Sequence, residues 1–294
     1  MVNIDFKSGF VSIIGKPNVG KSTLMNRLIG EKLSIVTPKP QTTRMNIRGF
    51  YNSNIAQIIF LDTPGFLEPR YELHERMMRY ITDSIKKSDV IIFLGDIADY
   101  PTEYDSKIIS LLKILKTPVI GILNKIEMCS NSQIQEKKEL LESNFLETFF
   151  ISALKDNEFN DLISCIVKHL PICQPLYNQE DLSDMPIRFF AQEIIREKIF
   201  LSYGKEIPYS STVVVEKWLE EEERDVIQAN IWVERDSQKP IILGSGGVKI
   251  GEIRSKAEKD IMNITGRKAV LNLWVKVKHD WRKKNGALQE FGYK

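Results

Sequence analysis

Eight consecutive residues have the types and the spacing that bind phosphate groups: Gly15, Lys16, Pro17, Asn18, Val19, Gly20, Lys21 and Ser22. In such a glycine-rich turn, backbone N–H groups and the positive end of the following helix hold the phosphates. Lys21 can reach the terminal phosphates, and the Ser22 hydroxyl can hold Mg²⁺. An apolar run, 10–14, precedes the turn, and a helix-compatible stretch that ends at Gly30 follows it. Strand, turn and helix are the context that this motif requires, so we predict a nucleoside triphosphate site.

A second polar turn follows a later apolar run, 55–61, and consists of Asp62, Thr63, Pro64 and Gly65. The Asp62 carboxylate can orient Mg²⁺ through a bound water, and the Gly65 N–H can bind a γ-phosphate oxygen and so sense it. We also assign the next residue, Phe66, to the nucleotide site. A tight turn of this composition can form in any protein, but its position downstream of the first turn favours the nucleotide.

The segment between the two turns, 37–44, is polar, contains two prolines and has no periodicity, so we predict a mobile loop. A hydroxyl of this loop can complete the Mg²⁺ shell only when the γ-phosphate is present, and we favour Thr43 over Thr42 for this role. Residues 37–44 and 62–70 are therefore expected to sense the nucleotide state. The predicted metal ligands are Ser22, Thr43 and Asp62.

Two further polar segments carry groups that can bind a base: Asn124, Lys125, Ile126 and Glu127, and then Ser152 and Ala153. Guanine presents its N1–H and N2–H groups side by side, so the Glu127 carboxylate can accept both. The Ala153 N–H can donate to the O6 carbonyl. Adenine offers neither that donor pair nor that acceptor, and a site built around hydrogen bonds rejects an analogue that leaves its groups unpaired. We therefore predict that the nucleotides are GTP and GDP.

The polar segments need a scaffold, and the apolar runs beside them predict one. Five runs recur with helical segments between them: 10–14, 55–61, 90–94, 119–123 and 149–151. Strands that are apolar on both faces fit a mostly parallel sheet covered by helices on each side. In such doubly wound α/β folds, ligands lie at the carboxyl ends of the strands. The sequence predicts this fold, because each polar segment of the nucleotide site follows one of these runs.

The length of 294 residues is comfortable for two domains. The strand rhythm stops near Pro171, and a polar stretch precedes the next periodic segment. We predict a nucleotide-binding domain over 1–172, a linker over 173–186 and a smaller α+β domain over 187–294. In the second domain we expect a helix, two strands, a helix and a strand: 187–202, 211–218, 226–233, 248–264 and 269–278. The acidic run 220–223 fits a hairpin turn.

The second domain contains a Gly-x-x-Gly loop that opens a helix: Gly244, Ser245, Gly246 and Gly247. Such a loop brings the protein backbone close to a nucleic-acid backbone, while single-stranded bases lie in an adjoining groove. Alone, the loop could be a structural turn. From Ser245 to Lys294, however, the chain has twelve Lys or Arg residues and five Asp or Glu residues, although its net charge is only +2. This bias favours RNA, with Lys249 and Arg254 among the phosphate contacts, over a merely solvated face.

The remaining composition excludes several classes of protein. The cysteines, Cys129, Cys165 and Cys173, are too few and too unevenly spaced for a disulfide framework or a four-ligand zinc site. The three histidines do not pair with them at zinc-site spacing, so we assign no metal beyond Mg²⁺. No apolar stretch approaches the roughly 20 residues that span a bilayer, and Met1 to Ser8 lacks the apolar core of a signal peptide. We therefore expect a cytoplasmic protein.

The nucleotide segments resemble the GTPase domain of translation factors in sequence, order and spacing. With the second domain included, essentially the whole chain resembles the Era family of ribosome-assembly GTPases. Further stretches carry this likeness: 41–44, 193–198, 207–210, 274–278 and 291–293. The resemblance implies GTP hydrolysis and a KH domain that binds near the 3′ end of small-subunit ribosomal RNA during maturation of the 30S particle. It also implies peripheral contact with the cytoplasmic face of the inner membrane, and we expect a monomer.

Two positions differ from related GTPases, and a third resembles a subgroup of them. The family has an aspartate where this chain has Glu127. We therefore expect nucleotide binding that is weaker by about 1 kcal/mol but still selective for guanine. Ras-like GTPases carry a water-orienting glutamine where this chain has Phe66, so we expect slow intrinsic hydrolysis. Asn18 resembles the asparagine by which potassium-activated GTPases bind a monovalent cation, which implies stimulation by K⁺. The predicted catalytic residues are Lys21, Thr43, Gly65 and Asn18.

The Gly-x-x-Gly loop also departs from the family pattern, which often has a lysine where this chain has Ser245 and Gly246. The attraction for phosphate must then come from Lys249, Arg254 or Lys256.

Two other functions stay open on the sequence. A P-loop kinase of a small molecule would use the second domain as a lid, although the base-binding segments argue against it. A membrane-associated regulatory GTPase would bind anionic lipid through the basic residues 282–284.

Overall fold

The computed structural model describes residues 6–156 and 158–293, and its contacts divide the chain into two compact units. The first unit contains the chain up to Ser34, Thr43–Glu68 and Met77–Asp184. The second contains Ile35–Thr42, Pro69–Arg76 and the chain from Met185 onward. The chain therefore passes between the units inside the predicted linker, but it also does so at four earlier points that the sequence did not reveal. Residues 1–5, part of the stretch on which we based the expectation of no export, lie outside the described residues.

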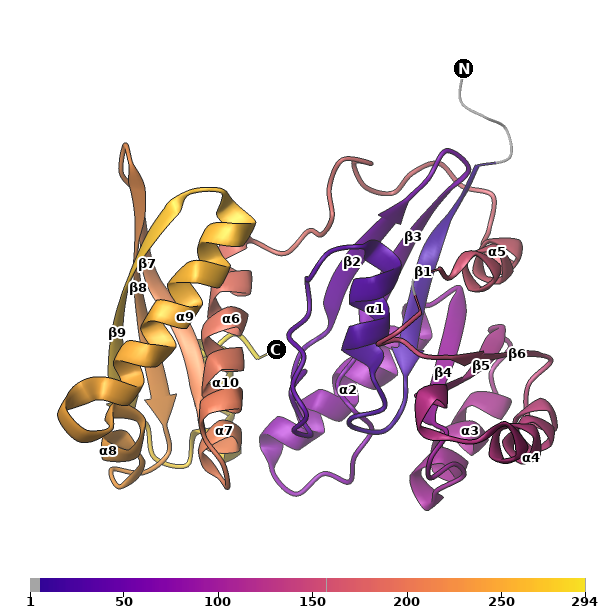
Figure 1. The fold of residues 1–294 in the computed structure, drawn as a ribbon, viewed down its shortest axis with the longest axis horizontal. Coiled ribbons are helices and arrows are strands. Elements are labelled where there is room, and N and C mark those ends of the chain that lie inside the picture. The colour runs from indigo at the N-terminus through magenta and orange to yellow at the C-terminus, as the bar shows by residue number, and fades with distance from the viewer. Residues whose placement is uncertain (1–5, 157, 294) are drawn as a thin grey trace. The chain divides into compact units, whose positions relative to one another are not determined.

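The first unit is built on a six-stranded sheet with the order β2-β3-β1-β4-β5-β6 (Figure 1). The strands are β1 (Lys7–Ile14), β2 (Ile47–Asn52), β3 (Ala56–Asp62), β4 (Val90–Asp96), β5 (Val119–Asn124) and β6 (Glu147–Ile151). Residues on both faces of the central strands are fully buried, such as the neighbours Ile91 and Ile92 on β4, as a sheet covered on both sides requires. The predicted P-loop α/β fold is confirmed, and each predicted strand is present.

One strand of this sheet was missed. The edge strand β2 pairs antiparallel with β3, whereas the other pairings in this sheet are parallel. Its residues mix apolar with polar side chains, including Arg48 and Asn52, so it does not read as the continuous apolar run of a central strand. An edge strand buries fewer side chains, which weakens its sequence signal.

Capping residues mark the ends of several helices that lie between the strands. The helices are α1 (Lys21–Ile29), α2 (Glu72–Lys87), α3 (Glu103–Lys113), α4 (Asn131–Glu142) and α5 (Asn160–His169). Helix α1 ends at Gly30, which adopts the left-handed conformation with a φ of 86°. Its backbone N–H donates to the Asn26 carbonyl oxygen in the last turn of the helix. Capping boxes start α3 at Thr102 and α4 at Ser130, where side chains accept the orphan backbone N–H groups.

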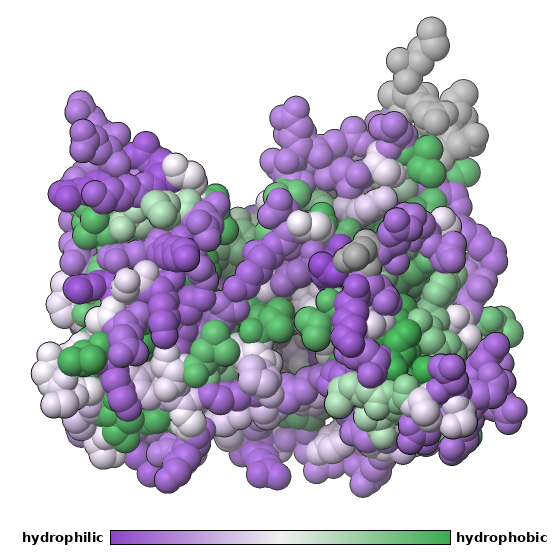
Figure 2. Space-filling view, viewed as in Figure 1, coloured by the Kyte–Doolittle hydropathy of each residue, from purple (hydrophilic) through white to green (hydrophobic). Residues whose placement is uncertain are grey.

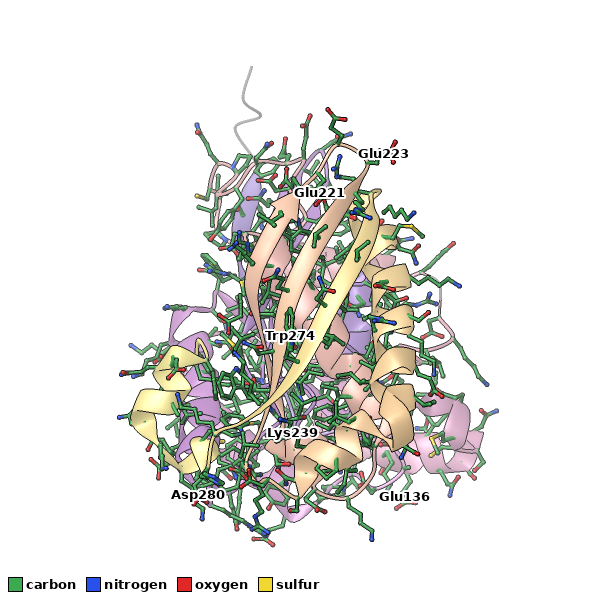
Figure 3. The ribbon with its side chains drawn as sticks, turned by 90° about the vertical axis from the view of Figure 1, so that its left-hand side faces the viewer. Glu136, Glu221, Glu223, Lys239, Trp274 and Asp280 are labelled. Carbon is green, nitrogen blue, oxygen red and sulfur yellow. The ribbon has the colours of Figure 1, made fainter. Side chains whose placement is uncertain are left out.

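The second unit packs two helices on one face of a three-stranded sheet, β7-β8-β9 (Figure 1). Its elements are α6 (Ile187–Ser202), α7 (Ile207–Ser210), β7 (Thr212–Glu220), β8 (Arg224–Val233), α8 (Gln238–Leu243), α9 (Val248–Thr265), β9 (Lys268–Val277) and α10 (Asn285–Glu290). Strands β7 and β8 form a hairpin whose acidic turn contains Glu221 and Glu223, while β9 runs parallel to β8 (Figure 3). Ile195, Ile231 and Ile253 are fully buried in the core between helices and sheet. The helix predicted over 187–202 has the observed bounds, whereas α8 and α10 were not predicted.

The opposite face of this sheet is covered in part by the C-terminal segment, where Trp232 on β8 packs against Phe291, whereas Trp274 on β9 is 47% exposed there (Figure 3). In the view of Figure 2, hydrophilic residues cover most of the surface and hydrophobic residues form scattered patches. Over the described ranges, no helix has both the length and the apolar character needed to cross a membrane.

Candidate functional site

The phosphate-binding turn lies between β1 and α1, and its backbone conformation depends on particular residues. Asn18 and Gly20 have positive φ angles of 65° and 101°. A Cβ atom on Gly20 would lie 2.4 Å from Asn124 Nδ2, and one on Gly15 would lie 2.2 Å from the Leu94 carbonyl oxygen. Both glycines are therefore required for the close approach of the turn to the neighbouring strand ends.

Lys21, at the start of α1, is buried beside this turn. Its Nζ donates to the carbonyl oxygens of Gly15 at 3.1 Å and Lys16 at 2.9 Å. Burial lowers the pKa of Lys21 from 10.5 to about 8, and the nearby Asp62 partly opposes this shift. The ammonium group is therefore held where it could exchange weak carbonyl acceptors for charged phosphate oxygens.

Three hydroxyl and carboxylate groups meet next to Lys21. Ser22 Oγ donates to Asp62 Oδ2 at 2.6 Å, Thr43 Oγ1 donates to the same oxygen at 3.3 Å, and the two hydroxyl oxygens are 2.9 Å apart. Asp62 Oδ1 is buried and has no hydrogen-bond partner among the described residues. Burial raises the pKa of Asp62, although its hydrogen bonds and Lys21 work in the opposite direction. An orphaned carboxylate oxygen beside two hydroxyl groups is the hard oxygen donor set that Mg²⁺ prefers.

The neighbouring threonine of the loop points elsewhere. Thr42 Oγ1 donates to the carbonyl oxygen of Lys39 at 2.7 Å and lies 2.6 Å from Thr37 Oγ1. It therefore stabilises the loop itself, and the geometry favours Thr43 as the metal ligand of the two.

The turn that follows β3 lies against the phosphate-binding turn. Thr63 Oγ1 donates to the Ile13 carbonyl oxygen at 2.7 Å, and the Phe66 N–H donates to the Gly15 carbonyl oxygen at 3.0 Å. A Cβ atom on Gly65 would lie 2.7 Å from Pro17 Cα, so the turns approach this closely only with glycine. The Phe66 side chain packs against the apolar core and offers no group that could orient a water molecule.

Asn124, at the end of β5, joins two predicted nucleotide segments. Its Nδ2 donates to the Val19 carbonyl oxygen at 2.7 Å, and its Oδ1 accepts the Ala153 N–H at 2.8 Å. This differs from our expectation that the Ala153 N–H donates to guanine O6, because that amide is already used to fix Asn124. To donate to O6, the Ala153 N–H must release Asn124 Oδ1 or be shared between the two acceptors. Ser152, which precedes Ala153, is buried and donates its N–H to Asp156 Oδ2 at 2.6 Å.

The remaining residues that we predicted to bind the base are Lys125 and two residues of the short helical turn Ile126–Met128 that follows it. Ile126 packs on the apolar core, whereas Glu127 Oε2 is buried with no hydrogen-bond partner in the part of the chain that the structure describes. A carboxylate oxygen without a partner suits the paired N–H groups of guanine. Lys125 Nζ binds Asp96 Oδ2 at 2.6 Å. We did not predict a role for Asp96. Its position could have indicated one, because Asp96 ends an apolar strand in the same way as Asp62 does.

The Gly-x-x-Gly loop joins α8 to α9 in the second unit. Gly244, Gly246 and Gly247 have φ angles of 71°, 59° and 79°, a region that favours glycine. Ser245, Gly246 and Lys249 are exposed, and Arg254 is exposed one turn further along α9. The loop thus presents backbone without side-chain bulk at the start of an 18-residue helix.

A basic hollow lies beside this loop, between α6 and α9. It has a volume of about 360 Å³, and its charged lining consists of Lys198, Lys249, Glu252, Lys256, Lys259 and Asp260. Four ammonium groups against two carboxylates leave it positively charged. Such a surface attracts polyanions.

Comparisons with known proteins identify both halves of the chain. Residues 10–125 match the family described as 50S ribosome-binding GTPase, and residues 206–282 match the KH domain. GTPase Era of Staphylococcus haemolyticus (strain JCSC1435) is 42% identical over 292 residues, which are 98% of this chain and 98% of that relative.

Two solved structures are similar over 98% of this chain and 99% of theirs, with a TM-score of 0.93 and 39% identity. One is Era in complex with MgGDPNP and nucleotides 1506–1542 of 16S ribosomal RNA. The other is a variant of Aquifex aeolicus Era bound to GDP·AlF4⁻.

Proposed function

Because the chain belongs to the Era family of GTPases, we propose that it is a GTP-dependent switch whose KH domain binds small-subunit ribosomal RNA near its 3′ end. The protein is a GTP-hydrolysing enzyme that uses Mg²⁺. The observation that carries the RNA proposal is the whole-chain similarity to an Era structure that holds nucleotides 1506–1542 of 16S ribosomal RNA. The protein then acts in maturation of the 30S particle, in the cytoplasm.

In the nucleotide site, we propose distinct roles for the residues at the phosphates. Lys21 would hold the terminal phosphates, Gly65 would donate its N–H to the γ-phosphate, and Asn18 would contribute to a K⁺ site. Ser22, Thr43 and Asp62 would hold Mg²⁺, which offsets phosphate charge when bound. Phosphoryl transfer depends mainly on such positioning and charge, so a slow rate follows from the absence of a water-orienting side chain at Phe66.

The RNA site is proposed at the Gly-x-x-Gly loop and along α9. The backbone of Gly246, which is exposed, and of the half-buried Gly247 can approach the phosphates, while Lys249 and Arg254 supply charge close by. Lys249 also lines the basic hollow, and its Nζ lies 5.5 Å from the Tyr203 ring centroid. These features support binding of a single strand along the loop.

The switch is supported by contacts within the second unit. Lys39 Nζ donates to the carbonyl oxygens of Phe200 and Tyr203 at the end of α6, and the Val36 N–H donates to Glu197 Oε1 at 3.2 Å. Thr43, which follows this segment directly, lies with the nucleotide residues of the first unit. A change at Thr43 would therefore pull on a segment that is bonded to the KH domain.

The test is binding of short single-stranded RNAs, including the small-subunit 3′ tail, in the presence of a GTP analogue, GDP or no nucleotide. We expect sequence-selective binding that depends on the GTP analogue. Nucleotide-independent or unselective binding would contradict the switch. Gly247→Asp should abolish RNA binding while GTP hydrolysis continues, because it places a carboxylate where phosphate must approach. The matched control is Gly286→Asp, which adds the same charge at an exposed glycine with open space around it.

Peripheral contact with the inner membrane is a further part of the proposal, and it rests on the family resemblance together with the basic residues 282–284. Competition between RNA and anionic vesicles at matched salt separates the two partners. Preference for the vesicles would favour a membrane-associated regulatory GTPase instead.

A further inference from the structure

A cysteine, a histidine and a glutamate meet at one edge of the first unit's sheet. Cys165 and His169 lie four residues apart on α5, so they share one helix face, and Glu147 is the first residue of β6. The thiol sulfur, an imidazole nitrogen and a carboxylate oxygen all lie within 4.8 Å of one another, and all three residues are partly buried. His169 Nε2 is already 3.7 Å from Glu147 Oε1. From the sequence we assigned no metal beyond Mg²⁺, and the cluster departs from that expectation because its third member, Glu147, comes from a different element.

We propose that Glu147, Cys165 and His169 bind Zn²⁺ or a similar borderline-soft divalent ion. Thiolate and imidazole are ligands that zinc prefers, and a carboxylate completes many zinc sites. Mg²⁺ and Ca²⁺ favour oxygen ligands only, so this donor set differs in selectivity from the nucleotide site. In a tetrahedral zinc site the ligand atoms lie about 3.3–3.6 Å apart. The three ligand atoms here lie within 4.8 Å of one another, so metal binding requires them to move closer together by about 1 Å.

The surroundings leave room for the rest of the coordination shell. Three protein ligands leave a fourth tetrahedral position for water. A cavity of about 210 Å³ is lined by Glu147 and His169, together with residues of α3 and of the segments around β5 and β6, and it gives an entry path. Lys168 Nζ bonds to Glu147 Oε1 at 2.7 Å, but its side chain is 66% exposed and can turn to the solvent or to the second carboxylate oxygen. In the latter position it orients the metal-binding carboxylate.

The cluster is remote from the nucleotide. Glu147 begins β6, and the predicted base-binding residues Ser152 and Ala153 follow the other end of this strand, roughly 15 Å away. Metal there would tie the edge strand to α5 without touching the phosphates. The inference therefore concerns stability of the first unit and does not depend on the proposed RNA binding.

Co²⁺ titration of the full chain tests the proposal, because a cobalt–thiolate bond gives a charge-transfer absorption that oxygen ligands do not. We expect this band to saturate at one equivalent and to disappear when Zn²⁺ is added. Cys165→Ser should remove it, while Glu147→Gln and His169→Asn, which remove direct ligands, should weaken Zn²⁺ binding by more than the roughly 10–100-fold that loss of an outer-shell partner costs. Cys173→Ser is the matched control and should keep the band.

The absence of a band from the native protein, or its survival in Cys165→Ser, would overturn the proposal. If Cys165→Ser does not fold, alkylation of the native protein gives the same answer. Zn²⁺ should then protect Cys165 but leave Cys129 and Cys173 reactive, as read from the labelled peptides. Equal labelling of Cys165 with and without Zn²⁺ would also overturn the site.

Discussion

The buried ammonium group of Lys21 predicts that nucleotide affinity depends on pH. In the free protein, burial lowers the pKa of Lys21 to about 8. Phosphate oxygens placed against Nζ favour the charged form, so the pKa is higher in the complex. A group whose pKa rises on binding contributes fully to the binding free energy at pH values below its pKa in the free protein, where it is already charged. As the pH rises through that pKa, this contribution is progressively lost. The contribution of Lys21 to GTP affinity should therefore be constant below about pH 7, and the affinity should fall by up to about tenfold for each pH unit above about 8.

Isothermal titration calorimetry in buffers of different ionisation enthalpy measures the linked proton directly. From the pKa of Lys21, this residue should take up about 0.1 proton on binding at pH 7, about 0.5 at pH 8 and about 0.9 at pH 9. The last phosphate ionisation, with a pKa of about 6, leaves about 0.1 proton on the free nucleotide at pH 7, which offsets the uptake by Lys21 there, and it adds little at pH 8 and 9.

Lys21→Arg is the control, because a guanidinium group stays charged over this range. It should bind with little proton uptake at pH 8 and 9. If the native protein takes up no proton there, or the arginine variant takes up as much, the reasoning about Lys21 is wrong.

Three further predictions concern the same site. Glu127→Asp should strengthen GTP binding by about fivefold, near 1 kcal/mol, because the shorter carboxylate meets the base edge without folding back; competition with a fluorescent nucleotide measures this, and unchanged or weaker binding would contradict it. Gly65→Ala places a methyl group 2.7 Å from Pro17 Cα, so kcat/KM for GTP should fall by about tenfold, near 1.4 kcal/mol, as the turn moves. GDP affinity should change far less, and an equal loss for GDP and GTP would remove the proposed role in sensing the γ-phosphate. Phosphate release should be faster in K⁺ than in Na⁺, with the difference lost in Asn18→Ala, whereas equal rates of the native protein in both salts would exclude a K⁺ site.

Features with a strong local pattern could be predicted from the sequence. The phosphate-binding turn combines a buried strand, glycines and a helix within about twenty residues, and α6 has a continuous apolar pattern that starts directly after Pro186. The fold class followed from the repeated apolar runs, because only a sheet covered on both faces buries such strands completely.

Features that depend on distant contacts could not be predicted. The use of the Ala153 N–H by Asn124 joins residues from two strand ends, and the cluster of Glu147 with Cys165 and His169 joins a strand to a helix. Neither pairing leaves a periodic signal in the sequence. Helix α8 was missed for a different reason, since it has only six residues and contains Pro240, which reads as a helix breaker.

The division of the chain gives the predicted switch a physical basis. Residues 35–42 and 69–76 belong to the second unit, whereas Thr43 and Gly65 belong to the first. The second segment is held there by Arg76, whose guanidinium donates to the Tyr293 carbonyl oxygen and to Asn285 Oδ1. Lys39, which is bonded to the end of α6, is only four residues before Thr43, so a movement of Thr43 on loss of the γ-phosphate would have few residues in which to be absorbed. Short connections of this kind would couple a change at the γ-phosphate to segments of the second unit, as the proposed switch requires.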